Sequence, residues 1–180
     1  NYWFERLPNS KTVYFQFNLV VNNSTEPLNA FVERLFRFVD ENDIEKLVID
    51  MRWNNGGNTY LSMPLLHGLI RSRKLSRRGH LFVVIGRGTF SAAQNTATFI
   101  ERHTPAIFVG EPTGGSPNLY GDPRPRALPV TGWNVHAASI FWERPVPRAS
   151  TNTRSRDCST IPRCCAASGS RSWPRTASRG

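Results

Sequence analysis

The sequence predicts an α/β domain with a mostly parallel sheet and flanking helices, followed by a tail of different composition. Three short apolar segments, at 46–50, 81–86 and 106–110, have the pattern of strands that are buried on both faces. Stretches of about 10 to 15 residues with helical periodicity alternate with them. Strands and helices in this alternation form right-handed βαβ units, which place the strands parallel in one sheet.

The elements before the first of these strands follow the same logic. Residues 12–21 (TVYFQFNLVV) are rich in β-branched and aromatic side chains and are predicted to form a strand. Apolar side chains within 28–39 recur at helical spacing, so this stretch is predicted to be an amphipathic helix. Ser24 or Thr25 supplies its start signal.

The later elements are less uniform. Residues 60–74 are predicted to form a helix that a proline and a glycine weaken, and 91–103 a stronger one. Glycine and proline are dense in 111–129, which is predicted to be a loop. Residues 133–143 are the last strand candidate.

The composition divides the chain into a core, 1–147, and an Arg/Ser-rich tail, 148–180. The tail contributes +6 of the net charge of +10 and holds all three cysteines, Cys158, Cys164 and Cys165. It has almost no aliphatic residues, which is the composition of a GC-rich gene read out of frame. Such a segment buries too little apolar area to offset its ordering entropy, so we expect disorder, with no disulfide framework and no metal site.

Several function classes receive little support. The remaining charge of +4 is spread over 1–147, and the basic run at 71–80 lacks interleaved aromatics, so we expect a solvated loop and no nucleic-acid partner. No apolar stretch approaches the ~18 residues that span a bilayer, so no membrane insertion is expected. The chain begins without Met or a signal peptide, so the natural N-terminus is expected to be missing. Compartment and oligomeric state leave no signal in the sequence.

Candidate functional residues follow the ends of the three apolar strands, where open parallel sheets bind ligands. In GRGTFSAAQN (86–95), Ser91 lies between a glycine-rich turn and a predicted helix. Ser91 and Gln94 fit a capping box at that helix start. A nucleophilic serine is also presented at such a turn, with the Ala92 amide beside it to stabilise an oxyanion. The two roles are compatible.

The loop after 46–50 holds Gly56 and Gly57. Their ordinary role is a backbone with positive φ, and their functional role is a second oxyanion donor. Asp50 and Arg52 are expected to form a structural ion pair. The glycines at 114 and 115 lack the lysine of a phosphate-binding loop, and each of the four histidines is more readily structural than catalytic.

Together, LVIDMRWNNGGN (47–58), GRGTFSAAQN (86–95) and FVGEPTGGSPN (108–118) resemble the tail-specific, or C-terminal processing, serine proteases, a family that includes the tricorn-core proteases. The resemblance spans roughly residues 12 to 142. It implies a core related to the ClpP and crotonase folds, a polypeptide substrate and no cofactor.

The resemblance also implies roles for individual residues. Ser91 is the nucleophile that forms an acyl-enzyme, and the amides of Gly56 or Gly57 and of Ala92 form the oxyanion hole. Glu111, Thr113 and Gln94 are candidates for lining the site.

One departure concerns the general base. The processing branch places a lysine shortly after the third motif, and 113–117 has none. The tricorn-like branch draws a histidine from a segment before the core. This chain alone is therefore expected to be a weak or inactive peptidase.

Two other functions on a related fold remain open. A non-catalytic module would bind a ligand or peptide without cleaving it. A crotonase-like acyl-CoA enzyme would use an oxyanion hole but would leave Ser91 without a role.

Overall fold

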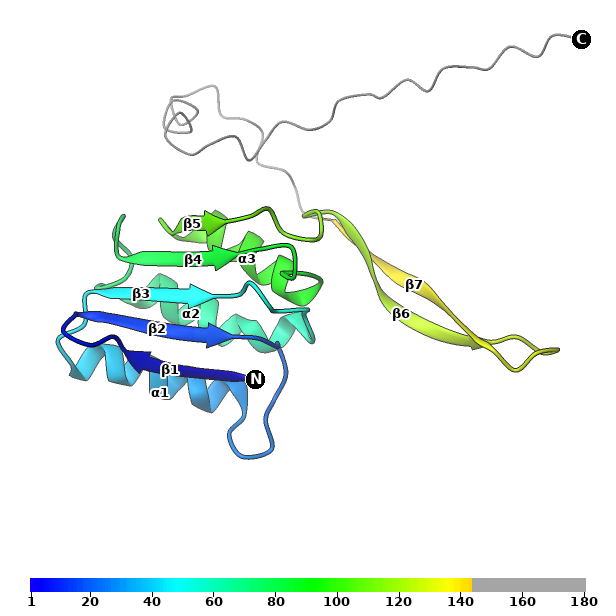
Figure 1. Cartoon of the computed structure of the whole chain (residues 1–180), viewed down its shortest axis with the longest axis horizontal. Helices are drawn as coiled ribbons and strands as arrows, with labels where there is room; N and C mark the ends of the chain where they lie inside the picture. Colours follow the sequence, from blue (N-terminus) through cyan, green and yellow to red (C-terminus); the bar gives the residue numbers. More distant parts are fainter. Residues whose placement is uncertain (144–180) are drawn as a thin grey trace, which may run out of the picture. The chain divides into compact units, whose positions relative to one another are not determined.

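A computed structural model describes residues 1–143, which all fall in one compact unit, Asn1–Val146. Five strands form one sheet in the order β1-β2-β3-β4-β5, with β1 antiparallel to β2 and the other four strands parallel (Figure 1). This is the mostly parallel sheet that the sequence predicts. The strands are β1 (Tyr2–Arg6), β2 (Thr12–Phe17), β3 (Lys46–Asp50), β4 (Leu81–Ile85) and β5 (Ile107–Gly110).

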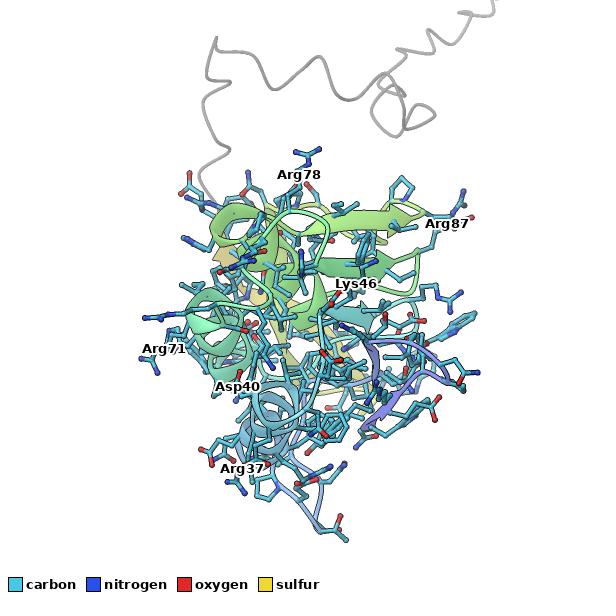
Figure 2. The ribbon with its side chains drawn as sticks, turned by 90° about the vertical axis from the view of Figure 1, so that its left-hand side faces the viewer. Arg37, Asp40, Lys46, Arg71, Arg78 and Arg87 are labelled. Carbon is cyan, nitrogen blue, oxygen red and sulfur yellow. The ribbon has the colours of Figure 1, made fainter. Side chains whose placement is uncertain are left out.

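The helices lie on one face of this sheet. Figure 2, viewed along the strands, shows all of them on the left of the sheet. They connect the parallel strands by crossovers, as βαβ units require. The helices are α1 (Leu28–Glu41), the short 3₁₀ helix η1 (Thr59–Ser62), α2 (Met63–Arg71) and α3 (Ala92–His103). Within residues 1–143, no helix is long and apolar enough to cross a membrane.

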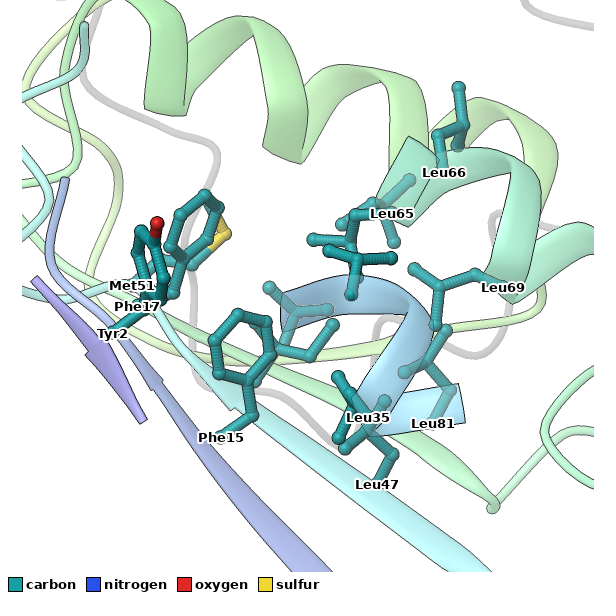
Figure 3. Packing of buried hydrophobic residues seen from close by; sticks show 14 of the residues in the cluster. Tyr2, Phe15, Phe17, Leu35, Leu47, Met51, Leu65, Leu66, Leu69 and Leu81 are labelled. Atoms are coloured by element: carbon teal, nitrogen blue, oxygen red, sulfur yellow. The ribbon is translucent and has the colours of Figure 1, made fainter. Parts of the chain in front are cut away.

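The core lies between the helices and one face of the sheet (Figure 3). On β2, the alternate residues Val13, Phe15 and Phe17 are fully buried, whereas Tyr14 and Gln16 between them are only partly buried. The same alternation continues in β3 and β4. A strand with period-2 burial has one covered face, which is how the sheet directs its apolar side chains toward the helices.

This arrangement corrects the expectation of strands buried on both faces. Val48, Phe82 and Val84 lie on the face away from the helices and are half-buried within the part of the chain that the structure describes. Strand β5 forms the edge of the sheet, and its Val109 is 49% exposed. The strands carry apolar side chains on both faces, but the helices cover only one face of the sheet.

Three further strand predictions are corrected. Strand β1 was not predicted, and the strand predicted at 12–21 ends at Phe17. The predicted loop at 111–129 contains β6 (Leu119–Ala127), which pairs with β7 (Asn134–Trp142) in a separate antiparallel hairpin. The prolines of β6 suit this place, because each strand of a two-stranded hairpin has an outer edge that needs no N–H donor.

The helix starts also differ in detail. The first amide of α1, at Leu28, donates to the side chain of Asn22 (3.0 Å), so neither Ser24 nor Thr25 caps this helix. Pro64 lies in the first turn of α2, where it causes no break. Residues 144–180 lie outside the described part of the chain, and so do the predicted tail, its cysteines and the boundary at 147.

Candidate functional site

The loops that follow β3, β4 and β5 meet at one edge of the sheet (Figure 1). Backbone hydrogen bonds join them. The amide of Phe90 donates to the carbonyl of Asn54 (3.0 Å), and the amide of Gly114 donates to the carbonyl of Thr89 (3.0 Å). The buried Thr89 hydroxyl donates to the Met51 carbonyl (2.7 Å). The predicted convergence of the three motifs is therefore present in the structure.

Ser91 occupies the turn between β4 and α3 with φ 53° and ψ −122°. A non-glycine residue with positive φ is uncommon, and this conformation carries strain on the order of 1–3 kcal/mol. The Ser91 side chain makes no capping hydrogen bond to α3, and the Gln94 amide donates to Thr98 Oγ1 (3.3 Å) instead. The predicted capping box is therefore wrong, because Ser91 does not have the extended backbone that an N-cap residue usually adopts.

Gly56 packs directly against this turn. Its φ is 111°, and a Cβ atom at Gly56 would lie 2.8 Å from Ser91 Cβ and 2.9 Å from the Ala92 nitrogen. Gly57, with φ 134°, is pressed against the carbonyl of Val20, where a Cβ atom would overlap it. Both glycines are therefore required, one by the approach to Ser91 and the other by the approach to Val20.

The amides around Ser91 differ in their availability. The Gly56 N–H donates to Asn54 Oδ1 (3.0 Å) and is therefore occupied. The N–H groups of Gly57 and Ala92 donate no hydrogen bond within residues 1–143. Of the two glycines, Gly57 thus has the amide that is free to bind a ligand oxygen.

Asn54 organises this loop, and sequence reasoning did not single it out. It is fully buried, and its Nδ2 donates to the Phe17 carbonyl (2.9 Å) while its Oδ1 accepts from Gly56. Its own carbonyl accepts from Phe90. The side chain and the backbone carbonyl of Asn54 thereby join the end of β2, its own loop and the turn before Ser91. The signal was present, because Asn54 precedes the glycine pair within the first motif.

Asp50 and Arg52 form the expected ion pair, with Arg52 Nη2 2.6 Å from the buried Asp50 Oδ2. Tyr14 also donates its hydroxyl to Asp50 Oδ2 (2.6 Å). Burial alone would raise the pKa of Asp50, but the hydrogen bonds from Arg52 and Tyr14 outweigh it and hold this pKa below its ordinary value. Burial and the bond to Asp50 raise the pKa of Tyr14. The pair anchors the end of β3.

The three candidate lining residues make contacts of their own and are not among the residues that line the pocket at Ser91 described below. Glu111 is exposed and pairs with Arg87 at 3.4 Å. Thr113 donates to the Gly115 carbonyl (3.0 Å), and Gln94 is buried beneath the Gly115 loop.

A different set of residues surrounds a pocket of about 360 Å³ that includes Ser91. Tyr60 and Trp142 lie on its walls with ring centroids 6.5 Å apart, and Trp142 Nε1 donates to Asp122 Oδ2 (2.7 Å). The sequence could not indicate this lining, since three of the lining residues come from the hairpin whose first strand was predicted as loop. The lining residues are Gly57, Asn58, Thr59, Tyr60, Ser91, Asn95, Leu119, Asp122 and Trp142.

No general base contacts Ser91 within the described residues, where its Oγ has no hydrogen-bond partner. His80 precedes β4 and contacts the Glu45 carbonyl at 2.7 Å, at the opposite edge of the sheet. His103 ends α3, about 18 Å along the helix from Ser91. His67 lies in α2 and His136 in β7. His67 and His103 thus lie in the two helices predicted at 60–74 and 91–103, His136 lies in the strand predicted at 133–143, and His80 lies in the basic loop at 71–80. Residues 1–143 also contain no cluster of three potential metal ligands.

Comparison with known proteins connects this architecture to peptidases. No family model and no curated protein matches the sequence. Among solved structures, a candidate peptidase from Parabacteroides merdae is 18% identical, with TM-score 0.58, covering 75% of this chain and 49% of that one. The photosystem II D1 C-terminal processing protease is 18% identical, with TM-score 0.54, covering 76% and 42%.

A candidate S41 protease from Bacteroides fragilis is 16% identical, with TM-score 0.54, covering 78% of this chain and 44% of that one. At these identities the likeness shows a shared α/β fold. The chain spans about half the length of these structures.

Proposed function

We propose that this chain is the core of a serine peptidase of the tail-specific family and that Ser91 is its nucleophile. The observation that carries the proposal is the strained backbone of Ser91 at a strand-to-helix turn. A helix start does not require this conformation, whereas exposure of a nucleophilic hydroxyl does. The proposed substrate is a polypeptide.

The neighbouring amides support an oxyanion hole made by Gly57 and Ala92. Both N–H groups lack a partner within residues 1–143, and Gly57 lines the same pocket as Ser91. The Ala92 amide also lies at the N-terminus of α3, where the helix dipole favours negative charge. One such donor is worth roughly 10²–10³ in rate.

The proposed reaction is acyl transfer. Ser91 Oγ attacks a peptide carbonyl, the amine leaves with a proton, and water then releases the acyl group. This sequence needs a proton acceptor at Ser91 Oγ, which the described residues do not supply. Since 113–117 also lacks the lysine of the processing branch, we propose the tricorn-like branch, in which a histidine from another segment is the base.

An activated ester tests the nucleophilicity of Ser91, because its leaving group departs without being protonated. We expect p-nitrophenyl acetate to release a slow burst that approaches about one nitrophenol per chain, because so good a leaving group lets Ser91 be acylated with little help from a base. The burst should disappear in Ser91→Ala and persist in Ser76→Ala, which changes an exposed serine far from the site. A burst of equal size in all three proteins would refute the proposal.

Because residues 1–143 place no base at Ser91, one alternative is also favoured, a module that binds peptides on the same fold without cleaving them. A measurable peptide affinity combined with no acylation of Ser91 would support this alternative.

A further inference from the structure

We propose that the pocket beside Ser91 binds the substrate side chain on the acyl side of the cleaved bond and selects lysine or arginine. This inference rests on the proposed function, because it takes the Ser91 hydroxyl as the point where the substrate carbonyl is attacked. The pocket includes both Ser91 and Gly57, so a carbonyl held between them would direct its own residue into this space.

The charge of the pocket supports a cationic occupant. Among the described residues that line it, Asp122 alone carries a charge. Its Oδ2 accepts a hydrogen bond from Trp142 Nε1, which fixes the carboxylate, while its Oδ1 accepts none within residues 1–143. The Asp122 backbone also has a positive φ of 52°, and the Ser139 hydroxyl donates to its carbonyl (2.6 Å). The hairpin therefore holds one carboxylate oxygen ready for a donor.

A second polar residue in the wall has one side-chain atom without a hydrogen-bond partner within residues 1–143. Asn95 is 2% exposed and lies one helical turn after Ser91. Its Nδ2 donates to Thr59 Oγ1 (3.0 Å), but its Oδ1 is buried without a hydrogen bond in the described part of the chain. A buried acceptor without a donor is costly. This oxygen has almost no accessible surface, so the N–H donors of an ammonium or guanidinium group in the pocket would contact the Asp122 carboxylate instead.

The aromatic walls suit the same occupant. Tyr60 and Trp142 approach each other with centroids 6.5 Å apart, and both are partly accessible. The methylene stem of lysine or arginine packs against such rings while its charged end stays polar, and a cation is attracted to their faces. An acidic side chain would meet the Asp122 carboxylate and be repelled.

Product-like peptides test the pocket separately from catalysis. We would measure the affinities of acetyl-Ala-Ala-Lys and acetyl-Ala-Ala-norleucine for the full chain by calorimetry. Norleucine keeps the lysine stem and removes only the charge. We expect the lysine peptide to bind about fivefold more tightly, because one partly exposed ion pair contributes about 1 kcal/mol at most. The preference should shrink at about 1 M salt.

Two variants test whether Asp122 causes the preference for the lysine peptide. Asp122→Asn keeps an acceptor for Trp142 and should abolish the lysine preference. Asp122→Lys should reverse it toward acetyl-Ala-Ala-Glu. Glu101→Gln is the control, since Glu101 is an exposed acid of α3 outside the pocket and should leave the preference unchanged.

The outcomes separate the two proposals. Equal affinities for the lysine and norleucine peptides in the unmodified chain would overturn the pocket assignment, even if the ester burst at Ser91 is observed. A lysine preference that survives Asp122→Asn would also overturn it. A preference that follows Asp122 without any ester burst would support the pocket and refute the peptidase.

Discussion

Ser91 combines two features that a helix start does not need. Its φ of 53° places it where glycine is favoured, and its hydroxyl has no hydrogen bond within residues 1–143. Strain at one residue persists only when its surroundings hold it, and here the Gly56 backbone presses against the same turn. The conformation therefore supports the role that we propose for the serine hydroxyl.

Because the backbone of Ser91 is strained, we expect glycine at position 91 to raise the free energy of unfolding although it removes the hydroxyl. Ser91→Gly should be more stable than Ser91→Ala by about 1–2 kcal/mol, because glycine adopts this φ and ψ without a steric penalty. Both variants lack the nucleophile and should give no ester burst. Urea unfolding of the two proteins measures the difference, and equal midpoints would show that position 91 is unstrained.

The pair formed by Asp50 and Arg52 predicts a pH dependence. Because the pKa of Asp50 is lowered on folding, its stabilising contribution is present above the unfolded value of about 3.9 and is lost as pH falls through the folded value. Asp50→Asn should flatten the fall in the unfolding midpoint below about pH 4. Asp40→Asn changes an exposed acid in α1 and is the control. An unchanged slope in Asp50→Asn would contradict the prediction.

At the scale of elements, the spacing of apolar residues predicts those helices and strands that pack one face against the core. The helical stripe of α1 and the apolar runs of β3 and β4 are visible in the sequence because each must face the core. The hairpin of β6 and β7 is not visible, because glycine and proline in β6 resemble a loop until a partner strand is known. Pairing between distant segments has no local signal.

Gly68 gives a prediction about helix packing. Substitution of an interior helical glycine by alanine usually stabilises a helix by about 1 kcal/mol. Here a Cβ atom at Gly68 would overlap the Phe36 ring of α1, so we expect Gly68→Ala to destabilise the protein by about 1–3 kcal/mol.

Two further variants check that cause. Phe36→Leu should recover part of the lost stability in the double variant. Gly79→Ala, in open space, should show only the cost of its φ of 85°. A stabilising Gly68→Ala would mean that α1 and α2 do not pack as described.

At the scale of the whole molecule, the sheet brings three motifs to one edge, and the order of strands and helices made this predictable. The walls of the pocket were not predictable from the sequence, because Asp122 and Trp142 reach the pocket only through pairing of the hairpin strands. The roles of Gly56 and Gly57 also differ for a reason that no sequence reveals. Asn54 occupies one amide and leaves the other free.

The absence of a base at Ser91 among residues 1–143 predicts a wide gap between two activities. We expect acylation by an activated ester to be slow but measurable, whereas peptide hydrolysis by the 180-residue chain stays near background, since a serine hydroxyl without a base is a poor nucleophile at neutral pH and a peptide has a poor leaving group. Peptide cleavage assayed by mass spectrometry checks this. Robust cleavage that Ser91→Ala abolishes would show that a base reaches Ser91 after all.

The central claim is that Ser91 is a nucleophile at a strained turn, and covalent labelling tests it most directly. The full chain would be treated with a fluorophosphonate and digested, and its modified serines located by mass spectrometry. We predict that Ser91 is labelled ahead of every other serine and that Ser91→Ala removes this adduct without creating another. Label spread over exposed serines, with Ser91 unmodified, would contradict the claim.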